Sequence, residues 1–385
     1  MAEETKEKVV KAPKEKKLAD PVAASIDLAT QEMIKRAQEL GIETVFDRAE
    51  NMKPCNIGIQ GTCCKNCAMG PCRLPLTKSV EDGPDERKGL CGATANTIAA
   101  RNFARMVAAG AAAHSDHGRC VAEVFLSAAR KETNDYRIKD VAKLLAIAPH
   151  LDVATTVEVD GEVKQRDIDE IAVEFGIKAL NEWGKAEGEL TYAKRAPKPL
   201  YEKWKKNGVI PRNIDREIVE IMHRTHMGVD QDYKNIVKQC TRASLADGWG
   251  GSMLATDQQD VLFGTPSPLQ SEANIGIMKE DHVNVIVHGH EPVLSEMIVA
   301  AAQSKEMVDY AKSKGAKGIQ LGGICCTANE VLQRHGVPPA GNFLQQELVI
   351  VTGACDAMIV DVQCIFQNLA NVAKCFHTKL ITTHP

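Results

Sequence analysis

Apolar residues recur at helical spacing along the chain up to about residue 260. They stand three and four residues apart in segments 33–40, 121–128, 168–175 and 214–222. This spacing places them on one face of an α-helix, so each segment predicts an amphipathic helix that packs against a core. The first helix is expected to begin at Pro21 and to end before a glycine, which favours a helix stop.

The pattern changes to short apolar runs after about residue 280. Four such runs, rich in apolar and β-branched side chains, occupy residues 283–288, 318–321, 357–361 and 380–382. Helical spacing returns between the runs, most clearly over 293–314. Strands that alternate with helices predict βαβ units, and therefore a parallel sheet.

Together the two patterns predict an α plus α/β fold with three segments. Residues 1–20 are rich in Lys and Glu and are expected to form a disordered tail. Residues 21–262 are expected to form a helical domain with a cysteine-rich loop, and residues 263–385 a Rossmann-like domain. Because no helix pattern follows the last predicted strand, one face of the sheet would stay uncovered. We therefore expect an incomplete α/β domain, the front part of a longer protein.

The composition argues against several classes of protein. The chain has 385 residues, with 47 Lys+Arg and 51 Asp+Glu, and its net charge of −4 gives no general attraction for nucleic acid or an anionic membrane. Aromatic residues make up only 4%, which disfavours stacking on single-stranded nucleic acid. No apolar run approaches the ~18 residues of a membrane span, and the N-terminus lacks the apolar core of a secretory signal. We expect a cytoplasmic protein.

The chain contains 13 cysteines, most of them in two groups. In the first group Cys64, Cys67 and Cys72 follow a C-x2-C-x4-C spacing in a Gly-rich loop, and Cys91 comes later. This spacing is typical of iron–sulfur cluster loops, with a zinc site and inert or redox-active thiols as alternatives. One cubane needs four thiolates, which leaves Cys55 and Cys63. A twofold dimer could bind a second cubane through both of them from each subunit, or both could be structural thiols.

A second set of soft ligands follows three of the predicted strands. His288 and His290 follow the first strand, Cys325 and Cys326 the second, and Cys364 the third. Because the carboxyl ends of parallel strands meet at one edge of a sheet, these side chains should converge there. Imidazole and thiolate ligands favour iron, nickel or zinc over magnesium or calcium.

Two further histidines, His114 and His117, lie about one helical turn apart on the run that follows the cysteine loop. Imidazole titrates near neutral pH, so the pair could form a proton path to a buried metal. Helix capping or a polar contact in the core is the alternative. Cys355 and Cys375 lie outside both patterns and are interpreted as structural.

Eight stretches of the chain resemble the anaerobic nickel–iron–sulfur carbon monoxide dehydrogenases. They follow the family order over nearly the whole chain after the tail. The stretches are CNIGIQGTCCKNCAMGPCR, CGATANTIAARN, GAAAHSDHGR, HRTHMGVD, HGHEPVLSEM, GGICCTANE, NFLQQELV and DVQCI. Hybrid-cluster proteins are the nearest relatives of this family, and their N-terminal cysteine spacing differs.

The resemblance implies a homodimer with three kinds of metal cluster. Cys55 and Cys63 of both subunits would bind a shared 4Fe–4S cubane. A second 4Fe–4S cubane lies within the subunit, and its implied ligands are Cys64, Cys67, Cys72 and Cys91. A nickel–iron–sulfur active-site cluster would use His290, Cys326 and Cys364, with His288 and Cys325 as the alternatives for the first two.

The resemblance also implies the reaction, the oxidation of CO with water to CO2, two electrons and two protons. His114 lies in the region of the active-site base, His117 would extend the proton path, and Asp247 would support His114 through a hydrogen bond. The implied partners are ferredoxin as electron acceptor and an acetyl-CoA synthase subunit. The family has more histidines along this helix, whereas Cys120 and Glu123 stand at the next positions here.

The family chain is expected to continue past this sequence, with further cluster cysteines and a catalytic lysine. A different hypothesis is therefore a truncated, non-catalytic iron–sulfur module for electron transfer or assembly. A hybrid-cluster protein is a third possibility, disfavoured by the HGHEP stretch and by the spacing of Cys55 and Cys63.

Overall fold

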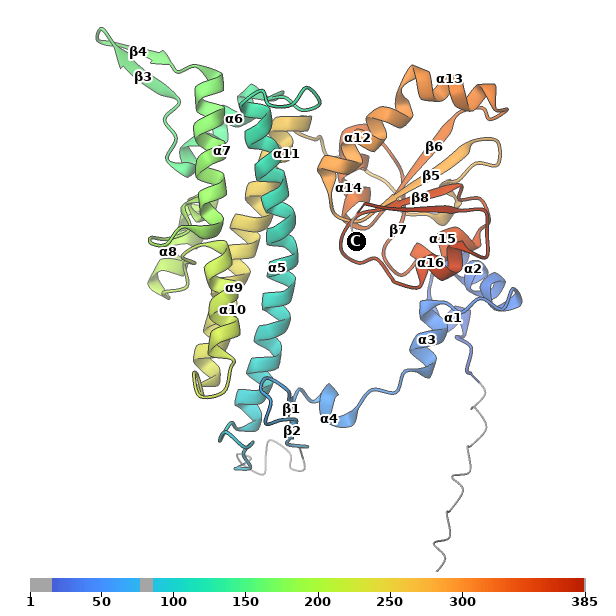
Figure 1. The fold of residues 1–385 in the computed structure, drawn as a ribbon, viewed down its shortest axis with the longest axis horizontal. Helices are drawn as coiled ribbons and strands as arrows, with labels where there is room; N and C mark the ends of the chain where they lie inside the picture. The colour runs from blue at the N-terminus through green and yellow to red at the C-terminus, as the bar shows by residue number, and fades with distance from the viewer. Residues whose placement is uncertain (1–15, 77–85, 384–385) are drawn as a thin grey trace, which may run out of the picture.

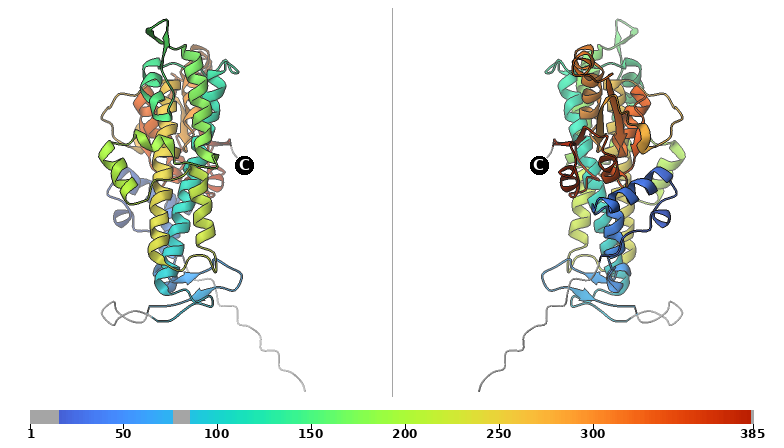
Figure 2. Two further views of the ribbon diagram at one scale, coloured as in Figure 1. Left: turned by 90° about the vertical axis from the view of Figure 1, so that its left-hand side faces the viewer. Right: turned by 90° about the vertical axis from the view of Figure 1, so that its right-hand side faces the viewer.

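The structure is a computed structural model that describes residues 16–76 and 86–383. Figure 1 shows a bundle of long helices beside a parallel sheet with its own helices, joined at the lower end by the segment around α4. Figure 2 shows that the bundle runs along most of the height of the described chain, with the cysteine loop at its lower end. The predicted α plus α/β fold class is confirmed.

Helix α5 (Ala95–Ala129) is the axis of the bundle, and the other long helices of the bundle pack around it. Its N-terminus is capped by the Thr94 side chain, which accepts a hydrogen bond from the Thr97 amide. Alanines at helical spacing, among them Ala104 and Ala108, are buried against neighbouring helices and let their backbones approach closely. The other bundle elements are α6 (Val141–Ile147), η2 (Ala148–Leu151), α7 (Ile168–Gly184), η3 (Thr191–Arg195), α8 (Lys198–Lys206), α9 (Ile214–Arg224), α10 (Tyr233–Leu245), the π-helical η4 (Ala246–Leu254) and α11 (Ala255–Phe263).

Two short antiparallel pairs extend the helical part at its opposite ends. Strands β1 (Cys63–Cys64) and β2 (Cys72–Arg73) pair in the cysteine loop, next to α4 (Asn56–Ile59). Strands β3 (Thr156–Val159) and β4 (Glu162–Gln165) form an exposed hairpin that projects from the far end of the bundle (Figure 1). The sequence analysis did not predict this hairpin, because its strands have no buried face to produce an apolar pattern.

The α/β part contains a five-stranded parallel sheet in the order β7-β6-β5-β8-β9. The first strand of this sheet, β5, lies in the middle. Strands β6 and β7 are added on one side of it, and β8 and β9 on the other, which is the Rossmann-like order that we expected. The helix predicted over 293–314 is divided in two. The first helix, α12, ends just before Ser304, and the Ser304 side chain caps the N-terminus of α13. The elements are η5 (Ile275–Ile277), β5 (Val283–His288), α12 (Pro292–Gln303), α13 (Lys305–Ser313), β6 (Ile319–Ile324), α14 (Cys325–His335), β7 (Pro339–Gly341), α15 (Gln346–Val351), β8 (Ala357–Val360), α16 (Leu369–Ala373) and β9 (Lys379–Thr382).

The first helices of the chain, α1 (Pro21–Ala24), α2 (Leu28–Glu39) and α3 (Val45–Asn51), pack on the α/β part. The buried face of α2 joins the core of the sheet domain, although the sequence analysis grouped residues 21–262 together. An apolar stripe indicates that one face of a helix is buried, but it does not indicate which element packs against that face. We propose that these three helices belong to the α/β domain.

One buried carboxylate holds this contact in place. Glu347, which is fully buried, accepts hydrogen bonds from the Val45 amide at 2.6 Å and from the Arg48 side chain at 2.8 Å. The end of the predicted tail is also anchored, since the Ala19 amide donates to Asp47 at 3.0 Å. The rest of that tail, residues 1–15, lies outside the described residues.

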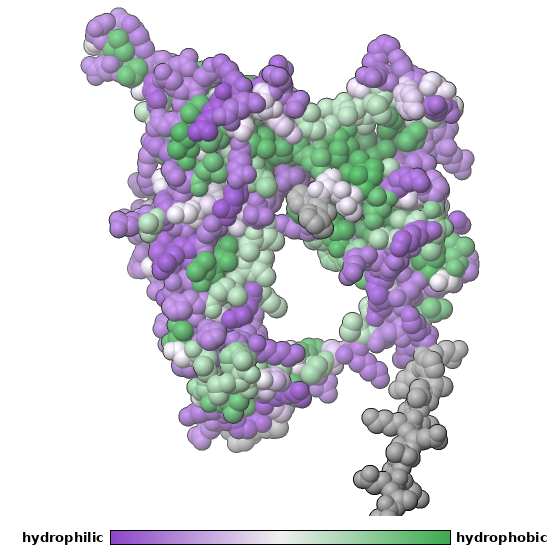
Figure 3. Space-filling model, viewed as in Figure 1, coloured by the Kyte–Doolittle hydropathy of each residue, from purple (hydrophilic) through white to green (hydrophobic). Residues whose placement is uncertain are grey.

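Figure 3 shows an opening between the bundle and the α/β part. Above it the two parts are in direct contact. Tyr136 donates to the Val293 carbonyl at 3.2 Å, and Arg334 pairs with Asp260 at 2.8 Å. Among the described residues, no helix combines the length and apolar character needed to cross a membrane.

Helix α5 touches η4 at a point where neither side has room for a side chain. A Cβ on Gly118 would lie 2.4 Å from the carbonyl oxygen of Gly251 and 3.2 Å from the Trp183 ring. The Trp183 indole N–H donates to the Ser115 carbonyl at 2.9 Å at the same crossing. This close approach fixes η4, and with it Asp247, against α5.

We predict that Gly118→Ala lowers the free energy of unfolding by roughly 1–3 kcal/mol, because the added methyl group forces the two backbones apart. Gly110→Ala is the matched control on the same helix, since a Cβ there meets nothing within 4 Å. Urea unfolding of both variants measures the difference. Equal stability of the two variants would contradict the close contact.

Candidate functional site

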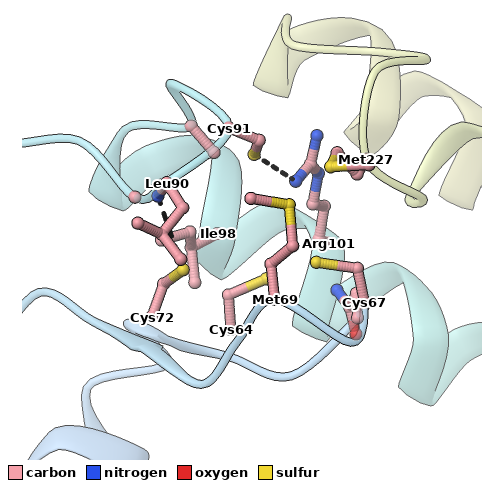
Figure 4. A pocket seen from close by; sticks show the side chains of 12 residues that line it. Cys64, Cys67, Met69, Cys72, Leu90, Cys91, Ile98, Arg101 and Met227 are labelled. Atoms are coloured by element: carbon pink, nitrogen blue, oxygen red, sulfur yellow. Dashed lines mark hydrogen bonds between the residues drawn. The ribbon is translucent and has the colours of Figure 1, made fainter.

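Four of the six cysteines in the first group line one pocket at the lower end of α5. They are Cys64, Cys67, Cys72 and Cys91, and Figure 4 shows their sulfur atoms turned toward a common space. The β1–β2 pair places Cys64 directly opposite Cys72. The turn before α5 brings Cys91 to the same space (Figure 4).

Two of these four thiols accept hydrogen bonds. The Leu90 amide donates to the Cys72 sulfur at 3.5 Å, and the Arg101 guanidinium donates to the Cys91 sulfur at 3.7 Å (Figure 4). Burial alone would raise the pKa of the Cys91 thiol, but hydrogen bonds from the Ala93 amide and Arg101 outweigh it and lower this pKa. The surroundings of Cys91 therefore favour the thiolate form that binds metal.

The pocket fits a 4Fe–4S cubane better than a single zinc ion. Throughout residues 16–76 and 86–383, no three His, Cys, Asp or Glu side chains form a group that could hold one metal ion. Four thiols spread around a pocket, with N–H donors aimed at the sulfurs, suit a larger group. The sequence analysis left the zinc alternative open, and this geometry disfavours it.

Cys55 and Cys63 are not among the residues that line this pocket. Cys55 is exposed at the N-terminus of α4, where the Gly58 and Ile57 amides lower the pKa of its thiol. Cys63 is half-buried on β1, and its carbonyl accepts a hydrogen bond from Asn102 at 3.0 Å. The structure thus separates the six cysteines into four and two, the division that the sequence analysis used.

The second set of soft ligands converges at the carboxyl edge of the sheet. His290, Cys325, Cys326 and Cys364 line one open cavity. They follow β5, β6 and β8, which are adjacent strands with β5 in the middle. This is the position at which open α/β sheets bind ligands, because the connections on either side of β5 diverge there.

The backbone at these cysteines is held in an unusual conformation. Cys325, Gln363 and Cys364 have φ angles of 65°, 68° and 57°, in the left-handed region that non-glycine residues rarely adopt. Such strain persists only where the surrounding structure enforces it, and it is common at functional sites. Here it turns two cysteines from different strands toward one cavity.

Burial and neighbouring thiols raise the pKa of Cys325 and Cys326 in this cavity. Burial is the largest cause and, together with the neighbouring Cys364 and Cys326 thiols, raises the pKa of Cys325 to about 12. Burial and Cys364 also raise the pKa of Cys326. A bound cation would reverse this effect, because it stabilises each thiolate. The donor set therefore fits a thiolate-ligated metal group.

His288, the last residue of β5, and His290, which follows it, have different surroundings. His288 is fully buried beneath the cavity, with its Nε2 atom 3.2 Å from the Gln346 amide oxygen. The buried Nδ1 atoms of both histidines have no hydrogen-bond partner among the described residues, but of the two only His290 lines the cavity. This placement supports His290 as the ligand. Cys325 and Cys326 both line the cavity, so that choice stays open.

Gly289 makes the turn between them possible. Its φ angle is 145°, and a Cβ there would lie 1.6 Å from a carboxylate oxygen of Asp361. Asp361 accepts hydrogen bonds from the backbone amides of His290 at 2.6 Å and Glu291 at 3.1 Å. The carboxylate thus fixes the backbone that presents His290.

His114 approaches His290, one of the residues that line this cavity, from α5. Its ring centre is 6.3 Å from that of His290, and its Nδ1 atom is 3.2 Å from the Asp247 carboxylate. The hydrogen bond to Asp247 raises the pKa of His114 despite partial burial. The structure therefore brings together His114 and Asp247, the pair that the sequence analysis associated.

His117 lies one turn further along α5 in a different environment. Burial, followed by the nearby His290 and His114 rings, lowers the pKa of His117 to about 4, so it is neutral near pH 7. Its buried Nε2 atom has no partner among the described residues. It lines a second open cavity with Cys120 and Glu291, next to the metal-ligand cavity rather than inside it.

The sequence analysis missed two residues that organise these sites. Gln363 donates from its side chain to the Ala113 carbonyl at 2.6 Å and so ties the Cys364 loop to α5 beside His114. Arg101 approaches the cysteine pocket. Both lie inside stretches quoted above, Gln363 in DVQCI and Arg101 in CGATANTIAARN, but their roles depend on contacts distant in sequence.

Residues 62–385 match the model of the Prismane/CO dehydrogenase family. The chain belongs to this family. It is 53% identical over 363 residues to carbon monoxide dehydrogenase 1 of Methanosarcina acetivorans, an alignment covering 94% of this chain and 56% of the relative. It is 44% identical to the carbon monoxide dehydrogenase/acetyl-CoA synthase subunit beta of Moorella thermoacetica, covering 93% and 52%.

Solved structures of the family share the fold. A nickel-free carbon monoxide dehydrogenase from Thermococcus sp. AM4, produced without the CooC maturase, matches with a TM-score of 0.88 and 49% identity. That alignment covers 96% of this chain and 57% of the other. The chain spans about half the length of the curated relatives that it matches.

We predict that Asp247→Asn lowers the pKa of His114, because the neutral amide no longer stabilises the imidazolium ion. NMR titration of labelled histidines measures this pKa. Asp116→Asn is the control, since this exposed acid lies on α5 but makes no hydrogen bond to His114. An unchanged pKa in Asp247→Asn would show that the contact does not influence the imidazole.

Proposed function

We propose that this chain belongs to a nickel-dependent carbon monoxide dehydrogenase, which oxidises CO with water to CO2, two electrons and two protons. One juxtaposition supports the proposal most directly. A cavity with imidazole and thiol ligands faces a histidine–carboxylate pair, with 6.3 Å between the rings of His114 and His290. The family match and the named relatives agree with this chemistry.

A nickel–iron–sulfur group held by His290, Cys364 and either Cys326 or Cys325 would supply a binding site for CO and lower the pKa of the attacking water. The residues of the chain handle the proton. Asp247 orients the His114 ring through Nδ1 and favours the protonated form, so Nε2 can accept a proton from the water. His117, one helical turn away, is the proposed next group on the proton path, and its pKa of about 4 makes it a weaker proton acceptor than His114.

The cysteine pocket would carry the electrons away. A 4Fe–4S cubane on Cys64, Cys67, Cys72 and Cys91 would lie at the lower end of α5, and α5 also carries His114. Electrons would pass from this cubane to a second one at the protein surface, and from there to ferredoxin. The exposure of Cys55 supports such a surface position.

The second cubane would be shared between two copies of the chain. Cys55 and Cys63 supply half of the ligands that a cubane needs, and a twofold axis supplies the rest. Exposed apolar side chains accompany them, including Ile59 on α4 and Phe103 and Met106 on α5. Figure 3 shows apolar surface over this lower end of the bundle. A homodimer would bury that surface.

An acetyl-CoA synthase subunit is the proposed partner for CO exchange. One relative is named as a subunit of a carbon monoxide dehydrogenase/acetyl-CoA synthase. A structure of an acetyl-CoA synthase/carbon monoxide dehydrogenase complex matches this chain with a TM-score of 0.84 and 42% identity. The proposed location is the cytoplasm, where free thiols such as the 13 found here stay reduced.

We predict that the anaerobically purified chain contains nickel and reduces a viologen dye when CO is added. Cys364→Ser should remove nickel and this activity but keep the iron of the cysteine pocket. Cys375→Ser is the matched control, because that exposed thiol lies outside both sites. Metal analysis and dye reduction measure both effects. Iron and sulfide without nickel or CO oxidation would instead support the non-catalytic iron–sulfur module.

The shared cubane gives a separate prediction. Replacing both Cys55 and Cys63 with Ser should remove one cubane per dimer and weaken the association of the two copies. Iron analysis and sedimentation measure these two effects, with Cys375→Ser as the control. If the iron content per dimer stays at the level of the unmodified protein, the assignment of these two cysteines is wrong.

A further inference from the structure

Arg101 is a fully buried cation at the edge of the cysteine pocket. It lies on the second turn of α5 and is only 1% exposed. One end of its guanidinium donates to the Cys91 sulfur at 3.7 Å, and the other donates to the Asp230 carbonyl at 3.1 Å. Figure 4 shows the side chain between Cys91 and Met227, beside the space that the four thiols share.

The charge of Arg101 has no carboxylate partner within the part of the chain that the structure describes. The nearby Asp230 carboxylate is occupied by the Arg224 side chain at 3.1 Å and by the Asp232 amide at 2.9 Å. The buried Nε atom of Arg101 has no hydrogen-bond partner among the same residues.

A buried cation is costly unless a negative charge lies close to it. The surroundings indicate where that charge resides. The remaining lining of the pocket is largely apolar and includes Met69, Ile98 and Met227. Among the described residues that line the pocket, only the four cysteines can supply negative charge at this position, as thiolates bound to a metal cluster.

We propose that Arg101 positions the Cys91 ligand and raises the reduction potential of the cluster bound in this pocket. The inference rests on the proposed 4Fe–4S cubane. When the cubane accepts one electron from CO oxidation, the cluster with its thiolates gains one negative charge. A fixed cation and an N–H···S hydrogen bond stabilise the reduced form more than the oxidised form, and therefore raise the potential.

The second hydrogen bond of Arg101 gives it a positioning role. Because the Asp230 carbonyl lies in the loop between α9 and α10, the guanidinium links that loop to the Cys91 ligand. The same side chain thus fixes the sulfur atom and supplies the charge. Its influence on CO oxidation would act through the rate at which electrons leave the active site.

The test is a redox titration of the cubane in the purified protein, followed by EPR. Arg101→Met and Arg101→Gln remove the charge, and Gln retains a hydrogen-bond donor. Arg101→Lys keeps the charge but cannot bridge both partners. Arg105→Met is the matched control, since it removes the same charge one turn further along α5, where Arg105 donates to Thr225 at 3.0 Å.

We expect a lower midpoint potential in Arg101→Met and Arg101→Gln at full iron content. Arg101→Lys should restore most of the shift, and Arg105→Met should match the unmodified protein. Loss of iron from Arg101→Met and Arg101→Gln but not from Arg101→Lys would also support Arg101 as the positive charge that balances the cluster. An unchanged potential in an iron-loaded Met or Gln variant, or loss of iron from all three Arg101 variants, would overturn the proposal.

These outcomes are distinct from a failure of the proposed function. Absence of iron from the pocket of the unmodified protein would contradict the cubane itself. An unchanged potential in loaded variants would contradict only the role of Arg101.

Discussion

The hydrogen bond from Gln363 to the Ala113 carbonyl joins the two halves of the candidate active site. The metal ligands lie on the sheet, whereas His114 and Asp247 lie on the bundle, and this bond is made one residue before His114 and one residue before Cys364. A proton acceptor is useful only within reach of the reacting water, so the chemistry depends on this docking. The glycine contact between α5 and η4 then fixes Asp247 behind His114.

Both candidate metal sites contain buried charged or polar groups that a bound cluster would stabilise. The cysteine pocket contains the buried cation Arg101, which has no carboxylate partner among the described residues and is stabilised by nearby negative charge. The cavity at the sheet edge has the opposite requirement, because burial and neighbouring thiols raise the pKa of Cys325, and a bound cation would stabilise its thiolate. His290 adds a buried nitrogen that has no hydrogen-bond partner among the residues that the structure describes. The cysteine pocket therefore suits a negatively charged cluster with its thiolates, whereas the cavity at the sheet edge suits metal cations.

The sequence predicted those features that depend on local spacing. Cys64, Cys67 and Cys72 lie in one loop, so their spacing alone indicated a shared cluster, and the alternation of strands and helices indicated a Rossmann-like sheet. The sequence analysis assigned His290 as the ligand and kept His288 as the alternative, because both lie at the end of the first strand and only the turn at Gly289 against Asp361 distinguishes them.

Features that depend on distant contacts could not be predicted. The stripe on α2 indicated a buried face but not that its partner was the sheet. Strand β7 is only three residues long and contains a proline and a glycine, so it lacks a strand pattern. Arg101 looks like any other helical arginine in the sequence. It stands 10 residues after Cys91, and only the fold brings the two side chains together.

The account can be tested most directly by diffraction at the iron and nickel absorption edges, from crystals of the protein grown without oxygen. It predicts an iron peak enclosed by Cys64, Cys67, Cys72 and Cys91, and a nickel peak with iron beside His290 and Cys364. Zinc in the cysteine pocket, or nickel located away from the carboxyl edge of the sheet, would contradict it.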